Sequence, residues 1–351
     1  MKLYYPTSHY DPRFRREVFP LLKPFIKGKG FTDEARIKLY GVSETDFQLV
    51  ETITEADVVV LPMAWNYYVK NRQLPKALEC IEAAKASQKQ VWSYNAGDFG
   101  VKIPEFDHVK VFRFSGYRAN GQKGHCGMPV FITDYLTQHY EEEAFLKKHY
   151  SPKPVVGFCG QADDRVLTTG KELFRTLFYL MQSKLGLRAE EPQTVGSTSR
   201  LRAALLKTLE RSDVIADNFI KRKQYRAGVT KNKAQHRTTK EFYDNILQSD
   251  YVLCVRGAGN FSVRFYETLM MGRIPVYIDT DGYLPLQDTI DWRNHVVWVD
   301  YNERHQVAQK VKAFHDALSA PDFIALQQSN RTLWKEKLTL GGFFKELVKQ
   351  K

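Results

Sequence analysis

The sequence lacks three features that would have placed it in a membrane or outside the cell. No apolar run among its 351 residues approaches the roughly 18 to 20 residues that span a bilayer. Its first residues, MKLYYPTSHYDPRF, have neither the apolar stretch nor the cleavage site of a signal peptide. It has four cysteines, and their spacing fits neither a metal site nor a redox pair. These absences predict a protein of the reducing cytoplasm.

Acidic residues are too few to balance the basic ones. The chain has 52 Lys and Arg against 40 Asp and Glu, a formal net charge of +12. The excess is concentrated in residues 196–240, where twelve basic residues stand against three acidic ones. Such a field predicts an anionic partner: nucleic acid, a nucleotide diphosphate, a phospholipid head group or a lipid-linked diphosphate. Because the region has no nucleic-acid motif and no interleaved aromatic platform, nucleic acid is the least favoured of these.

Short apolar runs alternate with helical patterns along the whole chain, which predicts an α/β fold. Strands are expected at 2–5, 58–62, 90–94, 109–113, 155–159, 213–216, 251–255 and 274–278. Helices are expected at 73–87, 133–149, 169–185, 198–211, 238–248 and 262–271, with a helical tail over 304–350.

The chain length and a break in the pattern predict two domains. The prolines of HYSPKPVV interrupt the alternation, and a new apolar strand begins at Val155. We therefore expect domains at 1–150 and 151–330, with 331–351 as a C-terminal helix that packs back on the first domain. Open parallel sheets bind ligands at the carboxyl ends of their strands, so a cleft between the domains is the expected site.

The stretch DYVLCVRGAGNFSVRFYETLMMGRIPVYIDTD, residues 250–281, reads as strand, glycine loop, helix and strand. Gly257 and Gly259 are expected to let a ligand approach the main chain closely. Asn260, Arg264 and Glu267, at i, i+4 and i+7, form a polar face distinct from the apolar one. Gly272 is expected to end the helix in the left-handed conformation.

Such a loop directs free N–H groups and a helix dipole at one point, which suits phosphate. Guanidinium groups suit bidentate phosphate contacts, and a carboxylate can accept hydrogen bonds from ribose hydroxyls. The predicted binding residues are Arg222, Arg226, Arg256, Gly257, Gly259, Asn260, Ser262, Arg264 and Glu267. The alternative is an ordinary α/β helix with Arg264 and Glu267 as a surface ion pair. The loop lacks the third glycine of a dinucleotide fingerprint, and no P-loop motif occurs.

The region SDYVLCVRGAGNFSVRFYETLMMGRIPVYIDTDGYLPLQDTIDW resembles the signature of the exostosin-like glycosyltransferases, particularly their bacterial members. The matching elements are RG after a strand, S-x-R-x-x-E at the helix start, GRIPV, and the downstream LP and IDW. A looser match extends from Val155 through FIKRKQYRAG to EFYDNIL. In the first half, VVVLPMAWNYY, GDFG and VFRFSGYR are reminiscent of the family.

The resemblance implies a GT-B fold, in which two Rossmann-like domains face an interdomain cleft. It implies an inverting transfer from a nucleotide diphosphate sugar, usually UDP-linked, with no obligatory cofactor or metal. The acceptor would be a saccharide or lipid-linked saccharide in surface polysaccharide or lipopolysaccharide synthesis. The enzyme would work in the cytoplasm, with its basic region near the anionic inner face of the membrane. A catalytically inactive nucleotide- or sugar-binding protein of this fold is the main alternative, and a nucleic-acid-binding protein a more remote one.

Inverting transfer needs a base for the acceptor hydroxyl and cationic or N–H stabilisation of the leaving diphosphate. The base is expected in a loop of the first domain, at the carboxyl end of a strand. Asp98, in NAGDFG, is the first candidate, followed by His9 and Asp11 and then by His125 in GHCG. For each residue the alternative is a structural role: the aspartates would form turns, and the histidines would be surface residues whose ring nitrogens are hydrogen-bonded.

Overall fold

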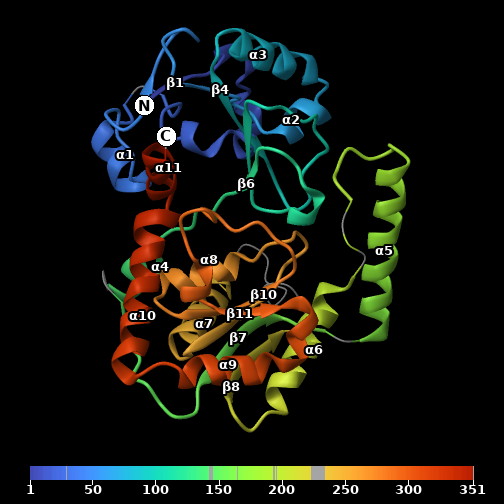
Figure 1. The fold of residues 1–351 in the computed structure, drawn as a ribbon, viewed down its shortest axis with the longest axis vertical. Coiled ribbons are helices and arrows are strands. Elements are labelled where there is room, and N and C mark those ends of the chain that lie inside the picture. The colour runs from blue at the N-terminus through green and yellow to red at the C-terminus, as the bar shows by residue number, and fades with distance from the viewer. Residues whose placement is uncertain are drawn as a thin grey trace.

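The computed structural model describes residues 1–28, 30–141, 145–163, 165–192, 194, 196–222 and 234–350. Within them the chain forms two parallel β-sheets, one from each half, and helices flank both (Figure 1). The lobe with the N-terminal sheet lies above the lobe with the C-terminal sheet in this view. The predicted α/β arrangement of two Rossmann-like halves, as in GT-B, is therefore confirmed.

The first sheet has the strand order β2-β1-β3-β4-β5-β6. Its strands are β1 (Lys2–Tyr4), β2 (Gln48–Leu49), β3 (Val58–Val60), β4 (Gln90–Asn95), β5 (Val109–Arg113) and β6 (His125–Gly127). Its helices include α1 (Asp33–Tyr40), α2 (Trp65–Lys70) and α3 (Leu74–Ala86). The sequence did not predict β2 and β6, because edge strands of two or three residues leave almost no pattern.

The second sheet has the order β11-β10-β9-β7-β8. Its strands are β7 (Val155–Gln161), β8 (Ala216–Arg222), β9 (Tyr251–Cys254), β10 (Ile274–Asp279) and β11 (Val297–Asp300). Tyr251 and Leu253 pack with α6 (Thr198–Glu210) and α9 (Val307–Asp316), whereas Val252 and Cys254 pack with α7 (Ala234–Leu247) and α8 (Val263–Met270). Because successive residues of a strand point to opposite faces, both faces of this sheet are buried.

Two predicted elements differ from the structure. The strand expected at 213–216 begins only at Ala216 and runs to Arg222. As an edge strand it has no fully buried residue, and Asp217 and Lys221 are exposed, so its apolar signal is weak. The helix expected at 133–149 is reduced to α4 (Tyr135–Tyr140), which ends where Glu141 takes a φ of 56°. A mid-chain αL residue of this kind has no sequence signature.

The C-terminal segment crosses from the second sheet back to the first. It comprises α10 (Ala320–Leu333), the π-helical turn η8 (Trp334–Leu338) and α11 (Leu340–Lys349), which rise along the left of Figure 1. The ring of Phe344 in α11 lies 5.7 Å from that of Phe19 and 5.8 Å from that of Trp92. On β4, Ser93 instead accepts a hydrogen bond from the α2 residue Trp65, so α11 and α2 cover opposite faces.

No helix in the described parts of the chain is both long enough and apolar enough to span a bilayer.

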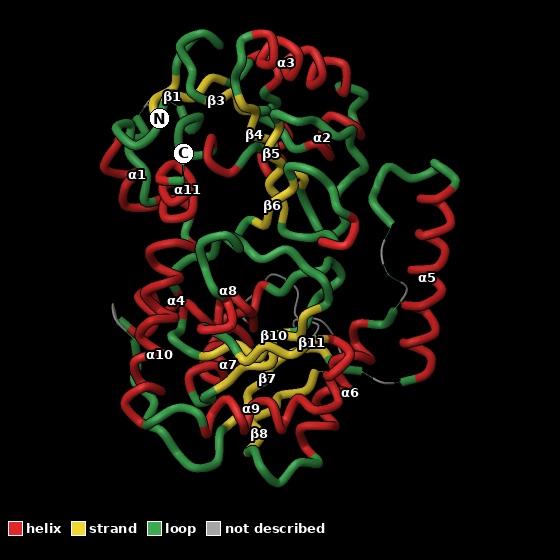
Figure 2. The backbone as a smooth tube through the Cα atoms, viewed as in Figure 1, coloured by secondary structure: helices red, strands yellow, loops and turns green. Residues whose placement is uncertain are grey.

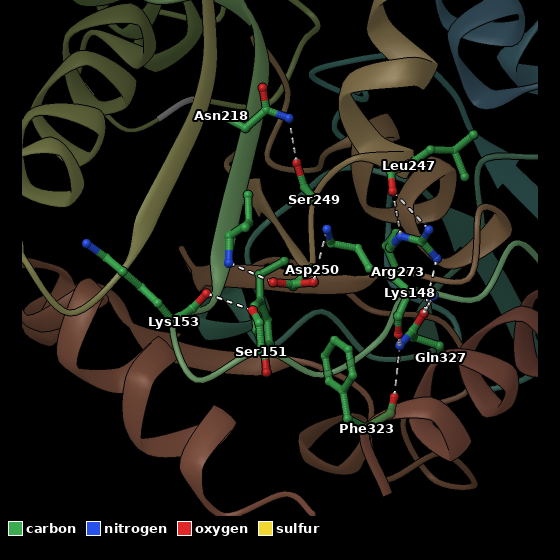
Figure 3. Close-up of polar contacts among 12 residues, drawn as sticks. Lys148, Ser151, Lys153, Asn218, Leu247, Ser249, Asp250, Arg273, Phe323 and Gln327 are labelled. Carbon is green, nitrogen blue, oxygen red and sulfur yellow. Dashed lines mark hydrogen bonds and ion pairs between the residues drawn. The ribbon is translucent and has the colours of Figure 1, made fainter. Parts of the chain in front are cut away.

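A buried polar cluster lies at the amino ends of the strands of the second sheet (Figure 3). Asp250, directly before β9, accepts a hydrogen bond of 2.7 Å from the Val155 N–H, and the Lys148 ammonium lies 3.6 Å from its other oxygen. Arg273, directly before β10, donates to the Leu247 carbonyl at 2.9 Å. Burial raises the pKa of Asp250 and lowers that of Arg273 to about 10. Ligands of parallel sheets bind at the opposite ends, so this cluster is structural.

Truncating Asp250 tests that role. We expect Asp250→Ala to lower the free energy of unfolding by about 2 kcal/mol, because an unsatisfied buried donor such as the Val155 N–H costs about 1–3 kcal/mol. Asp250→Asn keeps an acceptor at this position and removes only a buried charge, so we expect a smaller loss. Urea unfolding of both variants measures the difference. An alanine variant as stable as wild type would contradict the structural role.

Candidate functional site

The carboxyl ends of the two sheets face each other, and their loops meet. The Asn260 N–H, in the loop after β9, donates to the Ser115 hydroxyl after β5 at 2.8 Å. Arg118, in the same segment of the first lobe, pairs with Asp279 at the end of β10 at 2.7 Å. The edges at which open α/β sheets bind ligands are therefore brought together in this chain.

The glycine loop after β9 is shaped by the opposite lobe. A Cβ placed on Gly259 would lie 2.6 Å from the carbonyl oxygen of Asp98 and 2.8 Å from its Cα. At Gly257 the nearest atom, the Phe261 carbonyl oxygen, would be 3.8 Å away. Neither glycine has a positive φ. The close approach predicted for a ligand at Gly259 is thus made by the protein itself, and only Gly257 remains open.

Asn260 joins the two lobes. Its side-chain amide donates to the carbonyls of Gly116 and Thr280, both at 2.9 Å, and its Oδ1 accepts from the Thr280 hydroxyl at 2.7 Å. Asn260 also precedes α8, so the sequence placed it on the wrong element when it grouped Asn260 with a helix face. Every polar group of this side chain is engaged within the protein, which favours a structural role over a binding role.

Arg264 lies across the carboxyl ends of β7 and β9. Its Nη2 donates to the Cys159 carbonyl at 2.8 Å, and its guanidinium lies 4.3 Å from the centre of the Phe158 ring. Burial lowers the pKa of Arg264. The alternative had placed Arg264 in a surface ion pair, whereas its guanidinium lies across these strand ends and against the Phe158 ring. One turn further along α8, Glu267 accepts a hydrogen bond from the Tyr243 hydroxyl at 3.2 Å.

Arg256 lines a hollow between the lobes that is partly open to solvent. Its Nη1 donates to the Tyr117 hydroxyl at 2.6 Å. We call this space the interdomain hollow; its walls include Phe99, Arg175, Tyr179, Arg188, Arg256 and Ala258. The hollow therefore combines residues of both lobes, aromatic rings, three guanidinium groups and three carboxylates, of which Glu190 pairs with Arg188 at 3.1 Å. Aromatic faces beside polar and charged groups suit a ligand that carries a planar or sugar ring, and Arg256 is the cation of the loop after β9 that a phosphate could reach.

The remaining predicted binding residues are less exposed to this space. Arg222 forms an ion pair with Glu241 and donates to the Thr238 carbonyl at 3.2 Å. Ser262 occupies the N-cap position of α8 without making a side-chain cap. Arg226 lies outside the described residues.

Among the proposed bases, Asp98 is the one that the structure brings to the glycine loop. It lies in the loop after β4, remains exposed, and its backbone packs on Gly259. Partial desolvation raises the pKa of its carboxyl group, which strengthens it as a proton acceptor.

His9 and Asp11 lie in a different pocket, whose lining residues all fall within 8–13 and 67–76. Arg13 makes side-chain and backbone hydrogen bonds to Asp11 and lowers the pKa of that carboxyl to about 2. Burial and the charge of Lys76 lower the pKa of His9. Asp11 is thus held as a weakly basic, fully engaged carboxylate, and neither residue meets the loop after β9.

Arg113 determines the environment of His125. It also belongs to a set of residues between the lobes that the sequence did not predict. This fully buried guanidinium donates to Glu191 at 3.0 and 2.5 Å, and it lies 2.9 Å from His125 Nδ1. Burial, together with the charge of Arg113, lowers the pKa of His125 to about 3, so its imidazole is a poor base. The segment VFRFSGYR supplies Arg113, Ser115 and Arg118, and its resemblance to the family was the only available signal for it.

The two glycines of the loop give a matched test of the contact with Asp98. Gly259→Ala forces apart Asp98 and the loop, and overpacking of this kind costs about 1–3 kcal/mol of stability. Gly257→Ala meets no such atom, so we expect a change within about 0.5 kcal/mol. Thermal unfolding of both variants measures the difference. Equal stability of the two would mean that Asp98 does not pack on Gly259.

Comparison with known proteins identifies a family. A family model described as the Exostosin GT47 domain matches residues 38–314. Exostosin-1 of Drosophila melanogaster is 34% identical over 94 residues, which are 26% of this chain and 12% of that protein. The Exostosin-1 homolog of Caenorhabditis elegans is 36% identical over 83 residues, which are 23% of this chain and 18% of that protein. The chain thus aligns with less than a fifth of the length of these relatives.

Similar solved structures are more distant. TarM is 8% identical with a TM-score of 0.36, over 83% of this chain and 53% of that one. Sucrose-phosphate synthase from Thermosynechococcus elongatus is 11% identical with a TM-score of 0.34, over 84% of this chain and 73% of that one. Likeness this distant carries neither a residue role nor a ligand over to this chain.

The family match covers the parts of the chain described above. Residues 38–314 include the loop after β9, the segment that carries Asp98, and the residues that line the interdomain hollow. The chain therefore belongs to the exostosin GT47 family of glycosyltransferase domains.

Proposed function

We propose that the protein transfers a sugar, with inversion, from a nucleotide diphosphate donor to the hydroxyl of a saccharide or lipid-linked saccharide. The nucleotide is UDP in this proposal, because UDP-linked donors are usual among proteins that the chain resembles. One observation carries the proposal beyond family membership. An exposed carboxylate loop of the first lobe packs on a glycine loop of the second, and Phe99, Arg256 and Ala258 from these loops line the same hollow.

The second lobe holds the donor in this proposal. The Arg256 guanidinium receives the diphosphate beside Gly257, where an added Cβ would lie 3.8 Å from the nearest atom, since cationic groups stabilise the charge that develops on a leaving phosphate. Arg264 adds a partly buried positive charge at the ends of β7 and β9. Glu267, further along α8, accepts hydrogen bonds from the ribose hydroxyls. Asn260 holds the two loops together without touching the donor.

The first lobe supplies the base. Asp98 takes the proton from the acceptor hydroxyl, and the freed oxygen attacks the anomeric carbon from the side opposite the diphosphate. The new carbon–oxygen bond forms as the bond to the diphosphate breaks, and the diphosphate leaves with the bonding electron pair. Protonated Asp98 and the nucleotide diphosphate are the other products, and Asp98 then returns its proton to water.

Replacing Arg256 tests the donor site. We expect Arg256→Ala to weaken UDP binding by about 10- to 100-fold, because hydrogen bonds to charged groups contribute about 1.5–3 kcal/mol. Arg211→Ala is the matched control, since Arg211 is exposed at the end of α6, near the amino ends of the strands. Calorimetric titration with UDP measures both. Unchanged affinity in Arg256→Ala would remove this residue from the site, and no binding to wild type would argue for another donor nucleotide.

Replacing Asp98 tests the base. We expect Asp98→Asn to lower the transfer rate by about 100-fold or more while UDP binding is unchanged, since a positioned base contributes about 10²–10⁴-fold. For wild type, the rate should rise with pH as the carboxyl ionises, with an apparent pKa above its usual 3.8. Asp107→Asn, on the exposed surface of the same lobe, is the control. A fully active Asp98→Asn variant would place the base elsewhere.

A further inference from the structure

Helix α5 (Val166–Lys184) presents its apolar side to solvent. It stands beside the two lobes rather than on a sheet (Figures 1 and 2). Phe174 is 72% exposed, Phe178 48% and Met181 54%, and Leu185 and Leu187 just beyond the helix are 69% and 76% exposed. Six of the ten large apolar side chains found exposed in the described parts of the chain lie within 174–187.

These side chains form one stripe. Phe174, Leu177, Phe178, Met181 and Leu185 follow the i, i+3, i+4, i+7 spacing of a single helix face. In a surface helix of a globular protein such a face is turned toward the core. Here the stripe faces outward, and burying it requires a partner.

The opposite face of α5 is polar and contacts the protein. Glu172 accepts hydrogen bonds from the hydroxyls of Ser197 and Ser199 at 2.6 and 2.9 Å. Thr176 and Tyr179 line the interdomain hollow. The amphipathic orientation of the helix is therefore inverted relative to an ordinary packed helix.

Positive charge borders the stripe on both sides. Lys171 and Arg175 follow one edge and Lys184 the other, and all three are exposed. Glu172 is the only acidic residue of α5, and its hydrogen bonds turn it away from the stripe. An apolar face with cationic borders and no exposed acid matches a surface of apolar acyl chains beneath anionic head groups.

We propose that α5 docks the protein on a lipid bilayer that carries anionic head groups, with the stripe inserted and Lys171 and Lys184 at the head groups. A second copy of the chain fits this face less well. In a two-fold symmetric contact the same patch meets itself, so the cationic borders of the two copies would face each other.

This docking would also orient the site. The outer face of α5 would lie in the membrane surface while its inner face lines the interdomain hollow, so the hollow would open beside the bilayer. If the proposed transfer is correct, this position favours a lipid-linked acceptor over a free saccharide. The docking itself does not depend on the proposed transfer.

Vesicle sedimentation with the full chain tests the docking. The probes are vesicles of phosphatidylcholine and vesicles that also contain phosphatidylglycerol. We expect wild type to bind the anionic vesicles and the double variant Phe174→Ser, Phe178→Ser to bind them roughly tenfold or more weakly. Ile37→Ser, Leu39→Ser is the matched control, because these side chains of α1 are also 52% and 62% exposed. Lys171→Gln, Lys184→Gln is expected to reduce the preference for anionic over neutral vesicles.

Three outcomes would overturn the proposal: no vesicle binding by wild type, equal binding by the Phe174→Ser, Phe178→Ser variant, or an equal loss in the control pair. A wild-type dimer in gel filtration that dissociates in the serine variant, without vesicle binding, would assign the face to a second copy. UDP binding by the serine variant is measured in parallel. Since Phe174 and Phe178 lie on the outer side of α5 and do not line the interdomain hollow, retained UDP binding separates a failure of docking from a failure of the donor site.

Discussion

The buried ion pair between Arg113 and Glu191 fixes how the two lobes meet. Arg113 ends β5 and Glu191 follows α5, so the pair holds a segment of the second half against the first sheet. Its guanidinium also donates to the carbonyl of Ser115, and the hydroxyl of Ser115 accepts the hydrogen bond from the Asn260 N–H. A Cβ at Gly116, whose φ is 139°, would lie 2.6 Å from this guanidinium. Losing one member of such a pair costs about 3–5 kcal/mol, because the other charge stays buried.

The loop that carries Asp98 is held from two sides as a result. On one side its backbone packs on Gly259. On the other, the Lys102 N–H donates to the Ala189 carbonyl at 2.9 Å and the Glu191 N–H donates to the Gly100 carbonyl at 3.3 Å. A loop whose backbone is held in this way needs little rearrangement to present its side chain, which is what a positioned base requires.

The sequence predicted those features whose signals are local. The unit from β9 through α8 to β10 was correct because strand period, helix period and glycine positions agree along about 30 residues. Gly272 has the expected left-handed conformation, with a φ of 65°. Asp98 was chosen only from its place after a strand, and the structure adds its contact with Gly259.

The contacts between the lobes were beyond prediction, because they join residues far apart in the chain. Arg113 and Glu191 are 78 positions apart, and Asn260 and Ser115 are 145 apart. Each looks unremarkable in its own segment. Asp11 was a reasonable candidate base by position, but Arg13, two residues away, already engages its carboxylate. Sequence position gives the edge of the sheet on which a side chain lies, and only tertiary contacts decide whether it is free to react.

The return of the C-terminal segment has a mechanical consequence. The chain passes between the lobes once before β7 and again at η8, since α10 packs on α8 of the second lobe and α11 on the first sheet. Two bodies joined at one point can turn about any axis, whereas two bodies joined at two points turn freely only about the line through both. Because the segment that carries Glu191 also bonds to the first lobe, the backbone resists twisting of one lobe over the other at more than one place.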